Sequence, residues 1–221
     1  MNNSQFAQGA SRLQESSRAA WRKLGAPRAP DFDSVVDRYE EPHRAYHTLE
    51  HILECHGWLE VARDLAERPL EVELALLYHD IVYDPLRTDN ERQSAVLFGA
   101  HAASAGLAVE PARRISALIE GTASHSSCSG DAALVNDIDL AVLGASPRRY
   151  DLFEEQVRTE YAQIEFQDYR AGRARVLRAF LEKTTIYSTQ MFERRLEAQA
   201  RWNLPHALAD LEDGGASSPS S

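Results

Sequence analysis

Histidine and aspartate residues that could bind a metal ion lie close together at two places in this 221-residue chain. His47 and His51 are four residues apart, a spacing that puts both on the same side of a helix, one turn apart. His79 and Asp80 are adjacent. Neutral imidazole and carboxylate together suit divalent Mn, Fe, Co, Zn or Mg. The spacing of His47 and His51 alone is weak support, because such pairs are more often solvated or hydrogen-bonded.

The pair His79 and Asp80 is harder to explain without a bound metal ion. It follows the apolar run Leu74 to Tyr78, where burying an unpaired imidazole and carboxylate would cost several kcal/mol. Near the end of a helix both side chains can turn toward one ion. The alternative is that Asp80 caps the next segment and that His79 satisfies a buried carbonyl.

A third place holds Asp137 and Asp139, which flank Ile138. On a short helix these two aspartates lie on different faces, so only one is expected to reach the same site. The other would be an acidic charge that favours the helix dipole.

The ordered set of a histidine, a His-Asp pair and a later aspartate resembles the HD-domain superfamily of metal-dependent phosphohydrolases. The looser similarity is to its cyclic-nucleotide phosphodiesterase branch, which carries Tyr-His-x-x-x-His, as in Tyr46 to His51. The closer similarity is to the bacterial group called predicted metal-dependent HD superfamily phosphohydrolases, and it covers roughly residues 10 to 205. The matching positions are Tyr39, Arg44 to His47, His51, His79 to Asp84, Asp89 to Glu91, Ser94, Ala95, Asp137 to Leu140, Leu143, Gly144, Glu197 and Ala200 to Leu204.

This resemblance implies roles for individual residues. The metal ligands that it implies are His51, His79, Asp80 and Asp139. Asp139 is preferred to Asp137 because the Asp-Leu step that follows it is similar to the last motif of the family. His47 would be the general acid, like the first histidine of the phosphodiesterase motif.

Further residues are candidates for catalysis and substrate binding. The candidate substrate-binding residues are Arg44, Tyr83 and Asn90. Arg44 would clamp a phosphate, and the alternative is an ion pair with Glu40 or Glu41. Glu91 or His125 would hold a second ion or orient the water, so one or two ions per chain are both compatible with the sequence.

We therefore expect a metal-dependent phosphohydrolase that acts on a small phosphorylated metabolite, with a nucleotide as the first choice. The divalent ion would lower the pKa of the attacking water, and His47 would protonate the leaving oxygen. Two alternatives remain. One is a di-iron HD-type oxygenase with His125 and Glu91 as extra ligands, and the other is a catalytically silent sensor of metal and nucleotide.

Helical periodicity runs along nearly the whole chain without strand-like alternation, so the expected fold is all-α, a single HD-domain-like helical bundle. The expected boundaries are a flexible N-terminus over 1–10, the domain over 11–205 and a disordered tail over 206–221. Residues 71–80 are apolar on nearly every face, which is typical of a central helix. The main helices are expected over 44–67, 71–80, 91–106, 111–122, 131–143, 149–164 and 170–202.

The composition excludes several classes of protein. Apolar residues make up 43% and charged residues 26%, so disorder throughout the chain is excluded. A net charge of −10 disfavours binding to a nucleic-acid polymer. The longest apolar run is too short to span a bilayer, so no membrane partner is expected. The expected partner is the small phosphorylated substrate, and the oligomeric state is left open.

Two further observations concern the compartment. The two cysteines, Cys55 and Cys128, do not suggest a disulfide framework, and the N-terminus lacks the apolar stretch of a signal peptide. The first 30 residues are rich in arginine and serine, which can resemble a transit peptide. The helical spacing of Leu13, Ala20 and Trp21 favours a first domain helix instead. We therefore expect a cytoplasmic protein.

Overall fold

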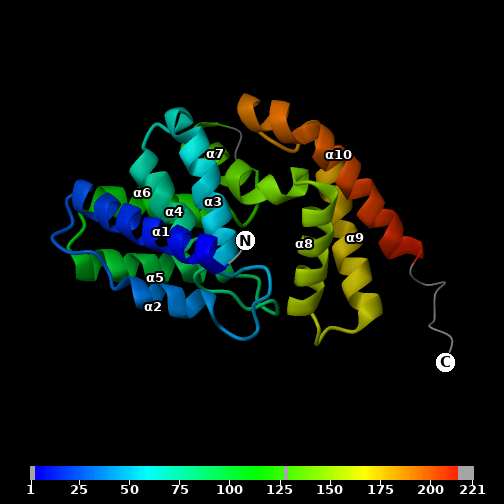
Figure 1. Cartoon of the computed structure of the whole chain (residues 1–221), viewed down its shortest axis with the longest axis horizontal. Coiled ribbons are helices and arrows are strands. Elements are labelled where there is room, and N and C mark those ends of the chain that lie inside the picture. Colours follow the sequence, from blue (N-terminus) through cyan, green and yellow to red (C-terminus); the bar gives the residue numbers. More distant parts are fainter. Residues whose placement is uncertain (1–2, 127–128, 214–221) are drawn as a thin grey trace. The chain divides into compact units, whose positions relative to one another are not determined.

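The structure is a computed structural model that describes residues 3–126 and 129–213 (Figure 1). Regular secondary structure in these ranges is helical throughout, which confirms the all-α class. The chain divides into two compact units, residues 1–139 and 140–221, which we call unit 1 and unit 2. The boundary between them falls where the helix ending at Asp139 gives way to a 3-10 helix. The single domain over 11–205 expected from the sequence stays a prediction.

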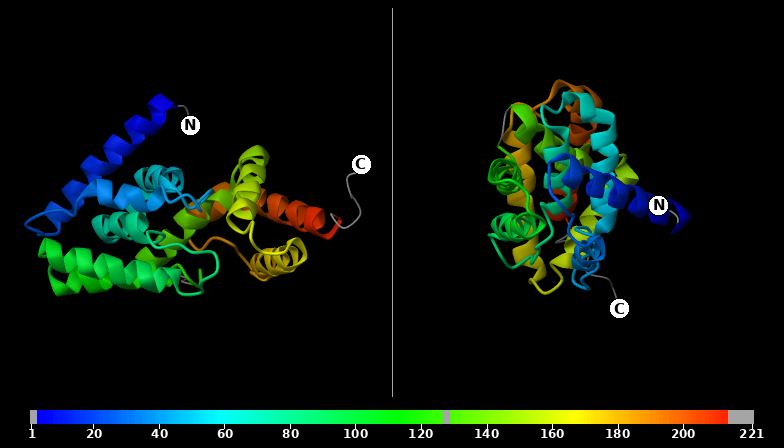
Figure 2. Two further views of the ribbon diagram at one scale, coloured as in Figure 1. Left: turned by 90° about the horizontal axis from the view of Figure 1, so that it is seen from below. Right: turned by 90° about the vertical axis from the view of Figure 1, so that its left-hand side faces the viewer.

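Unit 1 contains every residue predicted for the site. Its described elements are α1 (Asn3–Lys23), α2 (Phe32–Tyr39), α3 (Leu49–Ala62), the 3-10 helix η1 (Arg63–Leu65), α4 (Pro69–Tyr78), α5 (Asn90–Ala105), α6 (Val109–Gly121) and α7 (Gly130–Asp139). α5 packs against α6, and the left view of Figure 2 shows α1 as one straight helix.

α4 is the central helix of unit 1, as its apolar sequence predicts. It packs against α1, α3, α5, α6 and α7, and its residues from Glu71 to Tyr78 are all buried. The two buried carboxylates are paired with arginines, Glu71 with Arg114 and Glu73 with Arg63. Because α4 is enclosed on all sides, it fixes the position of the residues that follow it.

Three aromatic rings join the end of α4 to α1 and α5. Trp21 stacks on Phe98 with ring centroids 5.6 Å apart. Tyr78 meets Trp21 and Phe98 edge-on, at 6.3 and 5.1 Å. Aromatic pairs of this kind contribute about 0.5–1.5 kcal/mol each beyond their burial. Since Tyr78 is the last residue of α4, the rings anchor the helix end beside His79.

α1 begins earlier than the sequence suggests. Residues 1–10 were expected to be flexible, whereas α1 starts at Asn3, and only residues 1–2 of that segment lie outside the described residues. A Cβ at Gly9 would stand 3.3 Å from the side chain of Leu53 on α3. The glycine therefore lets the two helices approach closely, and this packing outweighs the low helix propensity of glycine.

Glycines end α1 and α5, as their positions in the sequence predict. Gly25 and Gly106 have left-handed backbones, with φ of +91° and +74°. After Gly106, the N–H of Leu107 donates to the carbonyl of Ala102 at 2.9 Å. This bond is that of a Schellman motif, which satisfies a carbonyl at the helix end.

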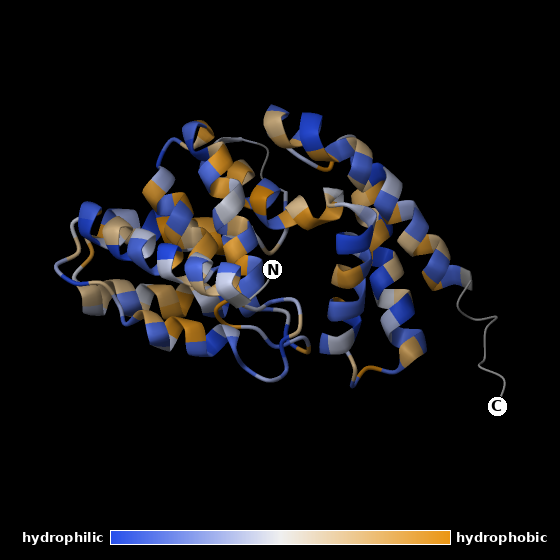
Figure 3. Cartoon of the chain, in the orientation of Figure 1, coloured by the Kyte–Doolittle hydropathy of each residue, from blue (hydrophilic) through white to orange (hydrophobic). Residues whose placement is uncertain are grey.

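Unit 2 consists, in its described part, of the 3-10 helix η2 (Leu140–Gly144), α8 (Pro147–Glu160), α9 (Phe166–Glu182) and α10 (Gln190–Asp213). α10 packs against η2, where Nδ2 of Asn203 donates to the carbonyls of Leu143 and Ala145 at 2.8 and 2.9 Å. Figure 3 shows hydrophilic and hydrophobic residues mixed along α8 and α9, as expected of amphipathic helices.

The single helix expected over 170–202 is instead the two helices α9 and α10. The segment between them, residues 183–189, is Lys-Thr-Thr-Ile-Tyr-Ser-Thr, whose β-branched residues have low helix propensity. The carboxylate of Glu197 accepts the backbone N–H groups of Ile186 and Tyr187 and so holds the turn.

α10 continues through Pro205 to Asp213, past the expected domain end at 205. Residues 214–221 of the expected tail, and Cys128, lie outside the described residues.

None of the described helices combines the length and apolar character that crossing a membrane requires.

Candidate metal centre

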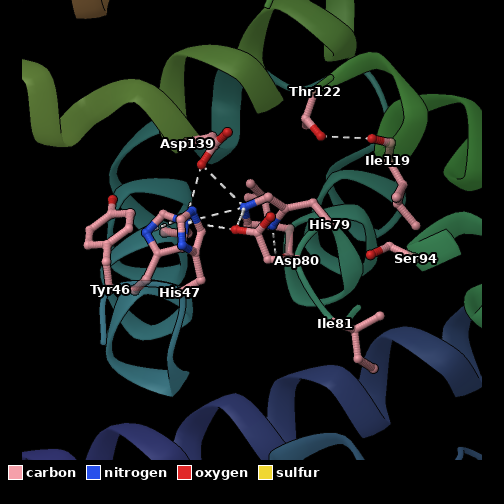
Figure 4. A network of polar contacts seen from close by, with 12 residues as sticks. Tyr46, His47, His79, Asp80, Ile81, Ser94, Ile119, Thr122 and Asp139 are labelled. Atoms are coloured by element: carbon pink, nitrogen blue, oxygen red, sulfur yellow. Dashed lines mark hydrogen bonds and ion pairs between the residues drawn. The ribbon is translucent and has the colours of Figure 1, made fainter. Parts of the chain in front are cut away.

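The four ligands implied by the resemblance come together at one place in unit 1. They are His51 on α3, His79 and Asp80 directly after α4, and Asp139 at the end of α7. One ligand atom of each lies within 4.8 Å of the other three. Figure 4 shows the side chains of His79, Asp80 and Asp139 pointing toward one another. Asp139, rather than Asp137, supplies the second carboxylate. We call this group of four side chains, His51, His79, Asp80 and Asp139, the metal cluster.

The distances within the metal cluster suit a shared divalent ion. Nε2 of His79 lies 2.9 Å from Oδ2 of Asp80 and 3.2 Å from Oδ1 of Asp139. Nε2 of His51 lies 3.2 Å from both Nε2 of His79 and Oδ1 of Asp139, and 3.6 Å from Oδ2 of Asp80. Nitrogen and oxygen atoms that bind one ion at about 2.0–2.2 Å are themselves roughly 3 to 3.6 Å apart. The donor atoms therefore have the separations that a common ion requires.

A backbone hydrogen bond orients His79 toward the other three donors. Its Nδ1–H donates to the carbonyl of Leu76 at 2.9 Å, so Nε2 faces the other ligands. Such a bond fixes the tautomer and raises the basicity of a ligating imidazole. The two histidine side chains are 1–2% exposed, whereas those of Asp80 and Asp139 are 13% and 15% exposed. Solvent therefore reaches the metal cluster at its carboxylates.

The electrostatics of the metal cluster favour a positive charge at its centre. Burial disfavours the imidazolium of His79, but the carboxylates of Asp80 and Asp139 outweigh burial and hold the pKa of His79 well above its ordinary value. Burial also disfavours the carboxylates, yet His79 and His47 lower the pKa of Asp80, and His79 and His51 lower that of Asp139. Two ionised carboxylates between two imidazoles are a donor set that a divalent cation would neutralise.

His47 lies beside the metal cluster, although it is not on α3. The helix expected from residue 44 begins at Leu49, because Thr48 has an extended backbone and occupies the N-cap position. The ring of His47 is nevertheless 6.2 Å from that of His51, and it stacks on Tyr83 with centroids 4.0 Å apart. His47 is therefore next to the metal cluster, as its predicted role as a general acid requires (Figure 4).

Arg44 does not fit the predicted role of a phosphate clamp. Its side chain is 0% exposed. Nη1 donates to the carbonyls of His47 and Asp80, both at 2.8 Å, and Nη2 donates to that of Ile81 at 3.1 Å. Nε and Nη2 also bind the carboxylate of Glu41, at 3.2 and 3.1 Å. These contacts engage all three nitrogens of the guanidinium, so the alternative of an ion pair with Glu41 is the one found.

Asn90 closes a loop. Its Oδ1 accepts the backbone N–H of Asp84 at 3.1 Å, and its Nδ2 donates to the carbonyl of the same residue at 2.9 Å. Both ends of the amide are therefore engaged within residues 84–90, and the structure gives Asn90 a role in this loop rather than in substrate binding. Glu91, in the first turn of α5, is not a member of the metal cluster.

His125 approaches the metal cluster from the end of α6. Its Nδ1 lies 3.8 Å from Oδ2 of Asp139, the oxygen opposite the one that faces His79. The backbone of His125 is left-handed, with a φ of +44°, which is uncommon for a residue with a side chain. His125 therefore contacts Asp139 without being one of the four clustered residues.

Two residues at the site were not predicted to take part in it. His43 donates from Nε2 to the carbonyl of Tyr83 at 2.8 Å, and its ring is parallel to that of Tyr83. Cys55 is buried, and its Sγ lies 3.7 Å from Nε2 of His51. The four-residue spacing of His43, His47 and His51 was the available signal for His43, but the first two precede the helix.

Comparisons of this chain with family models, with curated proteins and with solved structures find no match. The resemblance to HD domains therefore stands on the motif residues. The metal cluster is the structural feature from which a function has to be argued.

Proposed function

We propose that this protein is a metal-dependent phosphohydrolase that acts on a small phosphorylated metabolite such as a nucleotide. The observation that carries this proposal is the metal cluster, in which two imidazoles and two carboxylates converge. Four protein ligands leave coordination positions for water and for a phosphate oxygen on a five- or six-coordinate ion.

The residues of the chain have separate tasks in this proposal. His51, His79, Asp80 and Asp139 would hold the divalent ion, which when bound lowers the pKa of water and offsets charge on the phosphate. Substrate would enter from the side of the partly exposed carboxylates. His47, stacked on Tyr83 next to His51, would give its proton to the leaving oxygen.

The test is phosphate release from a panel of nucleoside monophosphates and sugar phosphates, with Mn²⁺, Fe²⁺, Co²⁺, Zn²⁺ or Mg²⁺ supplied in turn. We expect hydrolysis by the wild type and at least a 100-fold loss, roughly 2.7 kcal/mol of transition-state stabilisation, in Asp80→Ala and His79→Ala. His56→Ala is the matched control, because His56 is on the same helix as His51 but outside the metal cluster. Full activity of folded Asp80→Ala and His79→Ala would refute the proposal.

A di-iron oxygenase is the second candidate, because His125 lies against the outer oxygen of Asp139 and could support a second ion. This function predicts about two iron ions per chain and oxygen consumption, whereas hydrolysis needs no oxygen. Metal and nucleotide binding without turnover under any of the supplied metals would instead indicate a sensor.

A further inference from the structure

Side chains from the segment before α3 bind carbonyl groups in the last turn of α4 and in the turn that follows it. A helix leaves its last four carbonyls without partners inside the helix. The hydroxyl of Tyr39 donates to the carbonyl of Leu77 at 2.7 Å. The guanidinium of Arg44 donates to the carbonyls of Asp80 and Ile81 at 2.8 and 3.1 Å. The turn that presents the ligand Asp80 is therefore held by residues about 40 positions earlier in the sequence.

Arg44 connects this turn to the other side of the site. The same Nη1 atom that binds the carbonyl of Asp80 also binds that of His47, each at 2.8 Å. One nitrogen thus links the backbone of a metal ligand to that of the general-acid candidate. The rings of Tyr39 and Tyr83 lie 5.2 and 5.5 Å from the guanidinium carbon. These cation–π contacts favour a planar guanidinium at the position of Arg44.

We propose that Arg44 and Tyr39 are positioning residues that set the placement of Asp80 and His47 relative to each other. The proposal rests on the metal-binding part of the proposed function. Neither side chain is a member of the metal cluster, and both act through backbone carbonyls. Arginine is required rather than lysine, because an ammonium has three donors and no planar fork that could reach three carbonyls and Glu41 together.

A positioning role differs from a purely structural one in what it changes. A residue that only stabilises the fold lowers the melting temperature but leaves the metal affinity of the folded protein unaltered. Loss of groups that orient metal ligands typically lowers metal affinity by about 10–100-fold. The affinity and the coordination geometry of the bound ion are therefore the quantities to measure.

The experiment titrates Co²⁺ into the full-length wild type, Arg44→Lys and Arg38→Lys, and follows the visible absorption of the ion, whose bands depend on its geometry. Far-UV circular dichroism and melting in EDTA monitor folding separately. Arg38 is the matched control, because it is an exposed arginine that also binds Glu41, at 3.2 Å. We expect Arg44→Lys to lower Co²⁺ affinity by about 10–100-fold and to change the spectrum. Arg38→Lys should stay within about twofold of the wild type.

The outcomes separate the two proposals. If the wild type binds no metal, both this inference and the proposed function are overturned. If the wild type binds Co²⁺ and folded Arg44→Lys has the same affinity and spectrum, only this inference fails. Should Arg44→Lys not fold, Tyr39→Phe decides, since it removes one hydrogen bond and is expected to weaken Co²⁺ binding by about 3–10-fold. An unchanged Tyr39→Phe would then overturn the inference.

Discussion

Asp139 contacts three histidines at the metal cluster. Its Oδ1 lies 3.2 Å from Nε2 of both His51 and His79, and its Oδ2 faces His125. Asp139→Asn keeps the shape of the side chain, but it removes the negative charge and turns one oxygen into an amide donor. We expect the variant to lose its ion, with an affinity at least about 100-fold below that of the wild type, because the substituted group is itself one of the proposed ligands. Elemental analysis of the purified proteins measures this loss.

The control for this prediction is Asp37→Asn, which removes one carboxylate from an exposed position on α2. It should bind as many ions per chain as the wild type. Retention of a full complement of metal by Asp139→Asn would show that Asp139 is not a ligand.

The surroundings of His101 predict how the thermal stability of the protein depends on pH. Nδ1 of His101 lies 2.9 Å from the hydroxyl of Tyr78, and burial together with the nearby charge of Arg38 lowers its pKa. The folded state therefore favours neutral imidazole. The stability that the neutral imidazole of His101 contributes is fully present above its unfolded-state pKa of about 6.5. It is lost as the pH falls through its lower, folded-state pKa. Between about pH 7 and about pH 5, we expect the wild type to lose more thermal stability than His101→Gln, as measured by melting curves. An equal loss of melting temperature in the wild type and in His101→Gln over this pH range would contradict the lowered pKa of His101.

The four members of the metal cluster could be predicted from the sequence, because the resemblance to HD domains picks out a histidine, a His-Asp pair and a later aspartate in this order. The role of Arg44 could not be predicted. An arginine beside a histidine motif is compatible with a phosphate clamp and with an ion pair, and only the path of the backbone decides which carbonyls it meets. The contact between Gly9 and Leu53 is likewise a product of packing, and the sequence pattern does not report it.

At the scale of the elements, the contact between η2 and α10 in unit 2 depends on Gly144. A Cβ at this position would lie 2.5 Å from Cβ of Leu196 and 2.7 Å from its carbonyl oxygen. A backbone atom cannot move aside as a flexible side chain can. We expect Gly144→Ala to reduce the free energy of unfolding by about 1–3 kcal/mol, which denaturant titration would detect.

Gly99→Ala is the matched control for this prediction. Gly99 is inside α5, and a Cβ there would meet nothing within 4 Å. The substitution should therefore stabilise the protein by about 0.5–1 kcal/mol through the higher helix propensity of alanine. A neutral or stabilising Gly144→Ala would mean that α10 can move away from η2 at little cost.

Helix interiors were easier to predict than helix ends, for a physical reason. The apolar character of α4 and the glycine after α5 are local signals, and both predictions are confirmed. The start of α3 at Leu49 and the break between α9 and α10 depend instead on side-chain hydrogen bonds to the backbone outside the helices. Arg44 holds the carbonyl of His47 before α3, and Glu197 holds the turn at Ile186. Such contacts outweigh helical periodicity at the ends of elements.

At the scale of the whole molecule, the division into two units predicts where a bound ion adds stability. All four donors belong to unit 1, and they join α3, the end of α4 and the end of α7. An ion that binds only the folded state stabilises it by about 2.7 kcal/mol when its free concentration is 100 times the Kd. The bound ion therefore raises the free energy of any opening reaction that separates the elements carrying the four donors.

Hydrogen exchange measured with Mn²⁺ and with EDTA tests this expectation on the full-length protein. For amides of α3, α4 and α7 that exchange by global opening of unit 1, we expect exchange about 100-fold slower with the ion at 100 times its Kd, the rate equivalent of 2.7 kcal/mol. Amides of α9 and α10 in unit 2 should change much less, because no donor lies on these helices. Asp139→Asn provides the control, since its exchange should be the same with and without Mn²⁺. Equal slowing in both units would mean that they unfold as one cooperative structure, and no slowing in the wild type would mean that the metal cluster does not bind this ion.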